Sequence, residues 1–250
     1  MNCDFHVVIP ARYGSTRLPG KPLLDIGGKT LLQHVFESAA QSDAAGVTIA
    51  TDDERIEDLA RSFGGEVIMT SSAHVSGTDR ITEVVKRKKL GADTIVVNVQ
   101  GDEFNLPSAL INQVAVNLQN NTAASIATLC EEIDVETSSV DPSVVKVVRD
   151  KRNFALYFSR SLLPWRASEA EPGDTSKCYR HLGLYAYRTD FLKKFTDLPQ
   201  CELELVEKLE QLRALYNGYQ IHIDEACASG GIGIDTEEDL AQARALLKDS

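Results

Sequence analysis

The chain has 250 residues, a formal net charge of −11 and a hydrophobic content of 43%. This size suits one large domain or two small ones with a full hydrophobic core. The acidic balance argues against nucleic acid or an anionic membrane as the main partner, because both select basic surfaces.

The first half of the chain alternates between strand and helix patterns. We predict strands at residues 5–10, 46–52, 66–70 and 94–99 from short apolar runs. Apolar residues at helical spacing predict helices at residues 30–40, 54–63, 76–89 and 108–118. This alternation is typical of an α/β fold, in which a mostly parallel, Rossmann-like sheet carries helices on both faces.

The second half is richer in strands. Residues 144–160 predict two β-runs around a turn at 150–153. Residues 165–177 contain proline, glycine and charges, and are the best candidate for a mobile loop. Beyond it we predict a strand at 179–188, one amphipathic helix at 203–218, a strand at 220–224 and a helix from Thr236. We expect a single domain over residues 1–250, with a β-rich insertion at about 135–190.

Several features are expected to be absent. No run of 18 apolar residues occurs, so no membrane span is expected. The start, "MNCDF", lacks the basic and apolar regions of a signal peptide. The five cysteines are scattered, without a CxxC pair, which disfavours a disulfide framework or a zinc site and indicates a reducing cytoplasm.

The first predicted strand leads directly into "IPARYGSTRLPGKPL", residues 9–23. This segment holds Arg12, Arg17 and Lys21 but no carboxylate, and ligands of open parallel sheets bind beyond the carboxyl ends of the strands. It is not a Walker A loop, because its glycine spacing is wrong and Pro22 replaces the Ser or Thr. Its cations and backbone N–H groups can wrap a triphosphate. An ordinary loop whose cations pair with nearby acids is an equal alternative.

Carboxylates follow two later apolar segments. Asp102 and Glu103 come after Gly101 in "NVQGDEF", and Asp235 lies in "GIGIDTEEDL". Carboxylates at such strand ends are good ligands for a hard metal ion. Both have a structural alternative as helix caps, with Asp102 or Glu103 capping the helix near residue 108, and Asp235 or Thr236 capping the last helix.

"RHLGLY" places His181, Gly183 and Tyr185 on one face of a predicted strand. Gly183 leaves space between two polar side chains, which would suit the floor of a small polar ligand site. A lone histidine is more often structural, so this pattern by itself is weak.

Taken together, eight segments resemble the 3-deoxy-manno-octulosonate (Kdo) cytidylyltransferase family, in order and with similar spacing from about Val7 to the last helix. They are "IPARYGSTRLPGKPL", "ATDD", "SGTDR", "VNVQGDE", "LYFSRSLLPW", "YRHLGLYAYR", "EKLEQLRALYNG" and "GIDTEEDL". The resemblance implies a homodimeric, Mg²⁺-dependent cytoplasmic nucleotidyltransferase that transfers CMP from CTP to Kdo for lipopolysaccharide biosynthesis. It also implies that the β-rich insertion serves sugar binding and dimerisation.

The resemblance also implies roles for matching residues. Arg12, Lys21, Asp102 and Asp235 would be catalytic, and the two aspartates would bind magnesium. The CTP site would comprise Arg12, Arg17, Lys21, Ser76, Gly77, Arg80 and Gln100. The sugar-acid pocket would comprise Gln100, Arg160, His181, Tyr185, Glu210 and Gln211.

The chain departs from the family pattern in three places. Phe104–Asn105 follows "QGDE" where a proline is common, Glu237 replaces a proline, and "GKTL" stands in place of "GKPM". Alternatives stay open: the same reaction on 8-amino-Kdo or another sugar acid, a nucleotidyltransferase for a sugar phosphate, or a CTP-binding regulatory subunit without activity.

Overall fold

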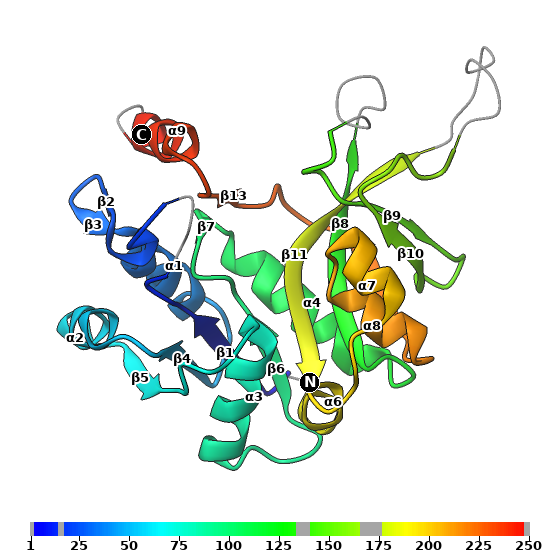
Figure 1. Ribbon diagram of the computed structural model, residues 1–250, viewed down its shortest axis with the longest axis horizontal. Coiled ribbons are helices and arrows are strands. Elements are labelled where there is room, and N and C mark those ends of the chain that lie inside the picture. Colours follow the sequence, from blue (N-terminus) through cyan, green and yellow to red (C-terminus); the bar gives the residue numbers. More distant parts are fainter. Residues whose placement is uncertain (1–2, 15–17, 134–140, 166–176, 248–250) are drawn as a thin grey trace.

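The computed structural model describes residues 3–14, 18–133, 141–165 and 177–247. A nine-stranded sheet forms its centre, with strand order β10-β9-β11-β6-β1-β4-β5, while β8 pairs with β11 and β12 pairs with β8 (Figure 1). The strands are β1 (Phe5–Pro10), β4 (Gly46–Thr51), β5 (Glu66–Met69), β6 (Ile95–Asn98), β8 (Ile126–Ile133), β9 (Lys146–Arg149), β10 (Ala155–Ser159), β11 (Cys178–Arg188) and β12 (Ile221–Glu225).

The first half of the sheet is parallel. β4, β1 and β6 run side by side in parallel, with β5 parallel to β4 at the edge. The long strand β11 reverses this direction, because it is antiparallel to β6, β8 and β9. The parallel half therefore directs the carboxyl ends of its strands, and the loops that follow them, towards one edge.

Helices cover both faces of the sheet (Figure 1). They are α1 (Leu31–Ala40), α2 (Glu54–Ser62), α3 (Gly77–Lys88), α4 (Ser108–Asn120), α6 (Thr189–Phe195), α7 (Glu202–Glu207), α8 (Gln211–Tyr216) and α9 (Glu237–Leu246). Short elements complete the described chain: the 3₁₀ helix η1 (Lys21–Leu23), and β2 (Asp25–Ile26), β3 (Lys29–Thr30), β7 (Glu103–Phe104) and β13 (Ile232–Gly233).

The alternation of side chains along β1 divides the core into two layers. Phe5, Val7 and Ile9 join one cluster with buried residues of α1, α2 and α4. Val8 points to the other face and joins a second cluster with α3, α6 and α8. Because both faces of this strand are buried, its residues Val7, Val8 and Ile9 are consecutive apolar residues, as is typical of a central parallel strand.

The structure confirms the predicted alternating strands and helices of the first half, within one or two residues at their ends. It also confirms the two β-runs at 144–160, since β9 and β10 are joined by a turn in which Asn153 N–H donates to Asp150 O at 3.0 Å. Most of the predicted mobile loop, residues 166–176, lies outside the described residues.

One prediction was wrong. The expected single helix at 203–218 is two short helices, α7 and α8. Lys208 adopts a left-handed conformation with φ of 57°, which ends α7 although the apolar spacing continues. We also missed β8 and α6; β8 begins with five consecutive buried residues, Ile126 to Cys130, a run too short to distinguish a strand from a buried helical turn.

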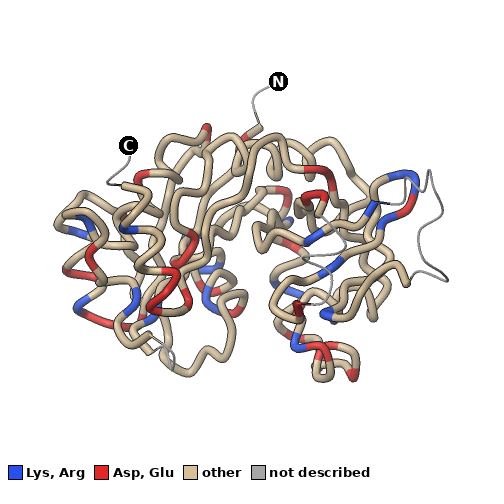
Figure 2. Tube along the Cα trace, turned by 90° about the horizontal axis from the view of Figure 1, so that it is seen from above, with Lys and Arg blue, Asp and Glu red and all other residues tan. Residues whose placement is uncertain are grey.

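Acidic and basic residues are interspersed along the chain in both halves of the molecule (Figure 2). In the part of the chain that is described, no helix combines the length and apolarity needed to cross a bilayer.

Candidate active site

Two aspartates from distant parts of the chain converge on one lysine. The Lys21 ammonium donates to Asp102 Oδ2 at 2.6 Å and to Asp235 Oδ1 at 3.0 Å. Lys21 begins η1, immediately after Gly20, whose φ of 67° turns the opening loop back towards the sheet. The predicted metal ligands and the predicted triphosphate-binding lysine thus form one cluster.

A small two-stranded ladder brings the aspartates together. β7 pairs with β13, matching Glu103 with Gly233, and Ile234 N–H donates to Asp102 O at 3.0 Å. Asp102 and Asp235 therefore lie at the same end of this ladder. The sequence could not have predicted this proximity, because Asp102 and Asp235 are far apart in the chain and are brought together by the pairing of β7 with β13.

The helix-cap alternative is wrong for the two aspartates, but Thr236, its other candidate, is confirmed as the cap of the last helix. Thr236 caps α9, accepting a hydrogen bond from Asp239 N–H at 3.2 Å in a capping box. Pro107 occupies the N-cap position of α4, without a side-chain capping bond. The Asp102 and Asp235 carboxylates are thus oriented by tertiary structure and not by a helix end.

Burial and the charges of the cluster shift the pKa values of Lys21 and of the neighbouring Glu103. Burial lowers the pKa of Lys21, but the charges and hydrogen bonds of Asp102 and Asp235 outweigh burial, so the pKa is raised overall. Burial, followed by the neighbouring Asp102 charge, raises the pKa of Glu103 to about 7. Lys21 is therefore a permanent cation in this site.

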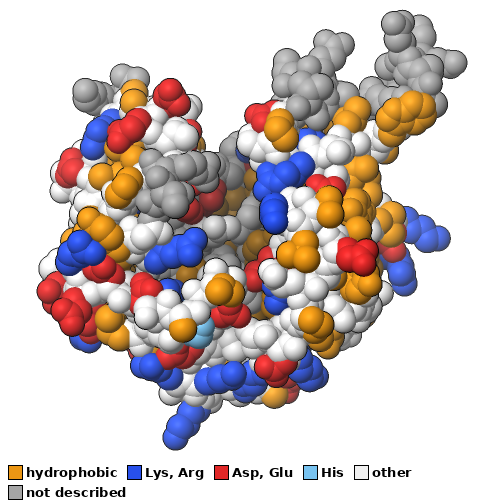
Figure 3. Space-filling model, viewed as in Figure 1, with side chains coloured by type: hydrophobic (Ala, Val, Ile, Leu, Met, Phe, Trp, Pro, Cys, Tyr) orange, Lys and Arg blue, Asp and Glu red, His pale blue; other side chains and the backbone are white. Residues whose placement is uncertain are grey.

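The cluster lies in a pocket of about 550 Å³, within the range of roughly 300–1,000 Å³ that is usual for small-molecule sites. Figure 3 shows this face of the molecule hollowed between its two halves. Eight of the predicted CTP and metal residues line the pocket: Arg12, Lys21, Ser76, Gly77, Arg80, Gln100, Asp102 and Asp235. Arg17 lies outside the described residues.

Arg12 and Lys21 differ in how they are held. The Arg12 side chain is exposed at the pocket and makes no hydrogen bond or ion pair with another described residue. Lys21 pairs with acids, as the ordinary-loop alternative expected, but these acids are the two predicted metal ligands.

Gly101 allows the ends of β1 and β6 to approach closely beneath the pocket. A Cβ atom at this position would lie 2.8 Å from Pro10 O, and backbone cannot move away as a flexible side chain can. Glycine here is therefore required by packing, and it sets where Asp102 leaves the sheet.

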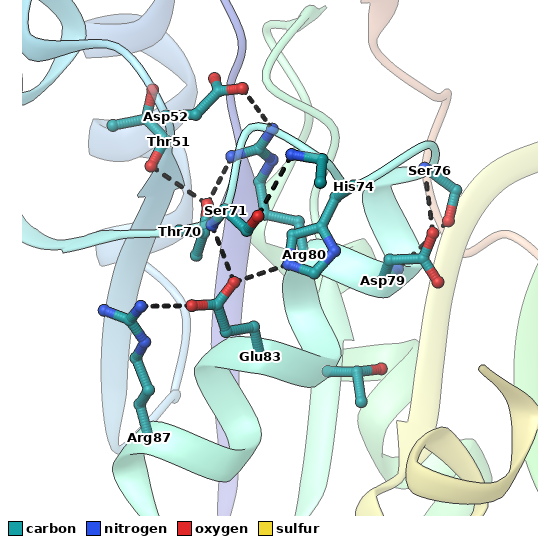
Figure 4. A network of polar contacts seen from close by, with 12 residues as sticks. Thr51, Asp52, Thr70, Ser71, His74, Ser76, Asp79, Arg80, Glu83 and Arg87 are labelled. Atoms are coloured by element: carbon teal, nitrogen blue, oxygen red, sulfur yellow. Dashed lines mark hydrogen bonds and ion pairs between the residues drawn. The ribbon is translucent and has the colours of Figure 1, made fainter. Parts of the chain in front are cut away.

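His74 is a pocket residue that the sequence reasoning missed. Its Nε2 lies 2.6 Å from Glu83 Oε2, and Glu83 also accepts from Ser71 N–H at 2.9 Å and pairs with Arg87 (Figure 4). The available signal was its place two residues before the "SGTDR" segment, whose first residue caps α3.

Gln100 joins this pocket to the β11 side of the site. Its Nε2 donates to Gly183 O at 3.3 Å, and it also lines a water-sized cavity of about 10 Å³ together with Gly183 and Glu103. A Cβ atom on Gly183 would lie 3.0 Å from Gln100 Nε2. Gly183 was predicted to leave space between His181 and Tyr185, but those two rings contact each other, and the side chain beside Gly183 is that of Gln100.

His181 and Tyr185 pack together on β11, with ring centroids 5.2 Å apart. His181 Nε2 lies 2.9 Å from Thr128 Oγ1, and its ring also meets Phe158 edge-on at 4.9 Å. Burial lowers the pKa of His181 to about 3, so the imidazole is neutral near pH 7.

Five predicted sugar-pocket residues are not among the described residues that line the large pocket: Arg160, His181, Tyr185, Glu210 and Gln211. Arg160 donates to two backbone carbonyls, Glu207 O at 2.9 Å and Pro142 O at 2.8 Å. Glu210 accepts from Thr78 Oγ1 at 2.5 Å, next to the pocket residue Gly77, and burial raises the Glu210 pKa.

Gln211 is 7% exposed, and its side-chain Nε2 has no hydrogen-bond partner in the described structure. A buried amide donor without a partner is costly, so this group is suited to a polar ligand atom.

Comparison with known proteins gives three findings. A family model described as "Cytidylyltransferase" matches residues 6–225. A Cellvibrio japonicus (strain Ueda107) protein named 3-deoxy-manno-octulosonate cytidylyltransferase is 54% identical over 251 residues, covering 98% of each chain. A solved structure described as CMP:2-keto-3-deoxy-manno-octonic acid synthetase complexed with CTP matches with a TM-score of 0.90 and 43% identity, over 98% of this chain and 99% of the other.

A more distant match shows the fold alone. A 4-diphosphocytidyl-2C-methyl-D-erythritol synthase from Anaerococcus prevotii DSM 20548 aligns with a TM-score of 0.62 at 12% identity, over 98% of this chain and 96% of the other.

Proposed function

Since the chain belongs to the cytidylyltransferase family, we propose that the pocket around Lys21, Asp102 and Asp235 is its CTP site. The enzyme transfers CMP from CTP to 3-deoxy-manno-octulosonate, and it releases pyrophosphate. The observation that carries the site assignment is the convergence of eight predicted residues, from segments 9–23, 71–80, 98–104 and 231–240, on one polar pocket.

A magnesium ion fits the donor set of this pocket. Asp102 and Asp235 direct carboxylate oxygens at the same point, which the Lys21 ammonium reaches at 2.6 and 3.0 Å. No cluster of three or more candidate His, Cys, Asp or Glu ligands occurs among the described residues. The two carboxylates suit magnesium, which is usually held by one or two carboxylates and completes its shell with water and substrate phosphates. When bound, it would neutralise phosphate charge and acidify a bound hydroxyl.

The chain's own residues provide the electrostatic part of the reaction. The C2 hydroxyl of Kdo attacks the α-phosphorus in line, and pyrophosphate leaves, so no protein nucleophile is needed. Arg12 and Lys21 stabilise the negative charge that develops on the phosphates, with Arg17 assigned to the same task. Lys21 is already oriented by two carboxylates, and therefore needs little reorganisation in the transition state.

We place the sugar acid beside Gln100, on the β11 side of the pocket. Gln100 borders the large pocket and contacts the strand that carries His181 and Tyr185. Glu210 and the unpartnered amide of Gln211 are further polar groups on this side. Two N–H groups of Arg160 are bound to carbonyls, so its remaining donors would bind the Kdo carboxylate.

The same proposal includes a homodimer in the cytoplasm that supplies CMP-Kdo for lipopolysaccharide biosynthesis. Apolar side chains are exposed on β10 (Leu156), after β10 (Trp165) and on α7 (Leu205 and Val206). They support an interface on this part of the surface. Figure 3 shows hydrophobic side chains gathered over this half of the molecule. Light scattering should give twice the chain mass, and Val206→Asp should lower it, whereas the control Val116→Asp on α4 should not.

Pyrophosphate release tests the activity. Each of the four nucleoside triphosphates should be supplied with and without Kdo, and only CTP with Kdo should give turnover. CTP binding without pyrophosphate release would instead indicate a regulatory subunit. Turnover with an aldose 1-phosphate, and none with Kdo, would indicate a different nucleotidyltransferase.

The far end of the sugar needs its own experiment. An amine in place of the C8 hydroxyl would favour a nearby carboxylate, and Glu210 is the acid assigned to this side. We propose Kdo as the preferred substrate over 8-amino-Kdo. A CTP-limited competition between the two decides this, and a clear preference for the amine would overturn the substrate assignment but leave cytidylyl transfer intact.

A further inference from the structure

Arg80 is a buried arginine that lines the pocket, and two residues that do not line it accept hydrogen bonds from its guanidinium. It lies on α3, is 3% exposed and lines the pocket. Its Nη1 donates to Thr70 Oγ1, and its Nη2 donates to Asp52 Oδ2 at 3.0 Å (Figure 4). A guanidinium has five N–H donors in a rigid fork, so two bound donors fix its plane and leave others for a ligand.

The two acceptors come from the ends of neighbouring parallel strands. Asp52 directly follows β4, and Thr70 directly follows β5. Thr70 is itself fixed, because both its N–H and its hydroxyl donate to Thr51 O, at 2.7 and 3.0 Å. Thr70 is therefore anchored to the sheet, and Asp52 stands one residue beyond the end of β4.

Asp52 belongs to the segment "ATDD", which the proposed chemistry does not otherwise use. We propose that Asp52 and Thr70 are positioning residues that hold the Arg80 guanidinium in the orientation in which it binds CTP. This inference rests on the proposed function of the pocket. Preorganising a flexible, rotamer-rich side chain reduces the entropy lost on binding, so its benefit is seen in ligand affinity.

A merely structural ion pair makes a different prediction. Such a pair would change the unfolding temperature and leave the CTP affinity of the folded protein unchanged. A positioning pair changes CTP affinity, and its effect depends on Arg80. Binding measurements therefore separate the two roles where activity alone would not.

Calorimetric titration with CTP and MgCl₂, without Kdo, tests the proposal. Asp52→Asn and Thr70→Val should each raise the CTP dissociation constant by roughly 10-fold, the scale of losing one hydrogen bond to a charged group. The control is Glu66→Gln, which removes a carboxylate that pairs with Lys88 at 2.7 Å and accepts from Thr48, away from the pocket on the same two strands. It should leave the constant unchanged.

A double-mutant cycle with Arg80→Lys completes the test. Adding Asp52→Asn to Arg80→Lys should cost far less affinity than adding it to the unchanged protein, because the group it orients is already altered. Additive losses, or an unchanged dissociation constant in Asp52→Asn, would overturn the proposal. Should Asp52→Asn fail to fold, Thr70→Val gives the same decision. Absence of CTP binding by the unaltered protein would contradict the proposed function instead, so the two failures are distinguishable.

Discussion

The Lys21 ammonium and the Asp102 carboxylate, 81 residues apart in sequence, are joined at 2.6 Å across the candidate active site. This pairing places a fixed positive charge beside a candidate metal ligand. It also makes the two residues interdependent, because removal of Lys21 takes this cation away from Asp102, and removal of Asp102 leaves Lys21 with one of its two carboxylates, Asp235.

Lys21→Ala should lower turnover by roughly 30- to 1000-fold, corresponding to about 2–4 kcal/mol of transition-state stabilisation. The reason is the loss of an oriented cation next to the leaving pyrophosphate. Steady-state kinetics in CTP measures this, with Lys29→Ala as the control, because Lys29 pairs with Glu37 in an exposed ion pair. A rise in the CTP Michaelis constant alone would mean that Lys21 binds only the ground state.

Asp102→Asn should lower turnover by roughly two orders of magnitude or more, since an amide is a much poorer ligand for magnesium than a carboxylate. Part of the loss should be recovered at high magnesium concentration. Circular dichroism should be unchanged. The matched control is Asp190→Asn, which removes an exposed acid paired with Lys194 at 3.3 Å. Near-normal turnover of Asp102→Asn at limiting magnesium would exclude the metal-binding role.

Gly101→Ala should reduce the free energy of unfolding by about 1–3 kcal/mol, because the added methyl group would meet Pro10 O at 2.8 Å and force the strand ends apart. CTP affinity should fall as well, since Pro10 and Gly101 both line the pocket. Chemical denaturation and calorimetric titration measure the two effects. In Gly91→Ala the nearest atom is 3.5 Å away, so this control should match the unaltered protein in both.

His181 should make stability depend on pH. Its pKa in the folded state is lowered to about 3, so the unfolded chain binds a proton below about pH 6.5 while the folded chain does not. This contribution is present above pH 6.5 and is lost as the pH falls. Between pH 7.5 and 5 the unaltered protein should lose about 1–2 kcal/mol more stability than His181→Gln. Denaturation curves without Kdo measure the difference, and parallel pH profiles would contradict a neutral, partly buried imidazole.

Much of the fold follows from local sequence. The apolar run Val7–Ile9 of β1 and the helical spacing around Ile56 and Ala60 in α2 show which side chains of each element are buried. The alternating first half was therefore predictable. Local signals failed where backbone conformation overrode side-chain pattern. The apolar spacing of residues 203–218 continues through Lys208, whose left-handed backbone nevertheless divides the helix.

The sequence by itself identified the candidate cations and carboxylates of the pocket, because they stand in short segments at predicted strand ends. Only the tertiary structure decided how they meet. Asp235 is 214 residues from Lys21, and its position beside Lys21 depends on the pairing of β7 with β13. These strands have two residues each, so no periodic sequence pattern predicts them. The contacts of His74 and Asp52 also depend on tertiary structure. Their partners, Glu83 and Arg80, both lie on α3, and the core beneath this helix holds it over the strand ends.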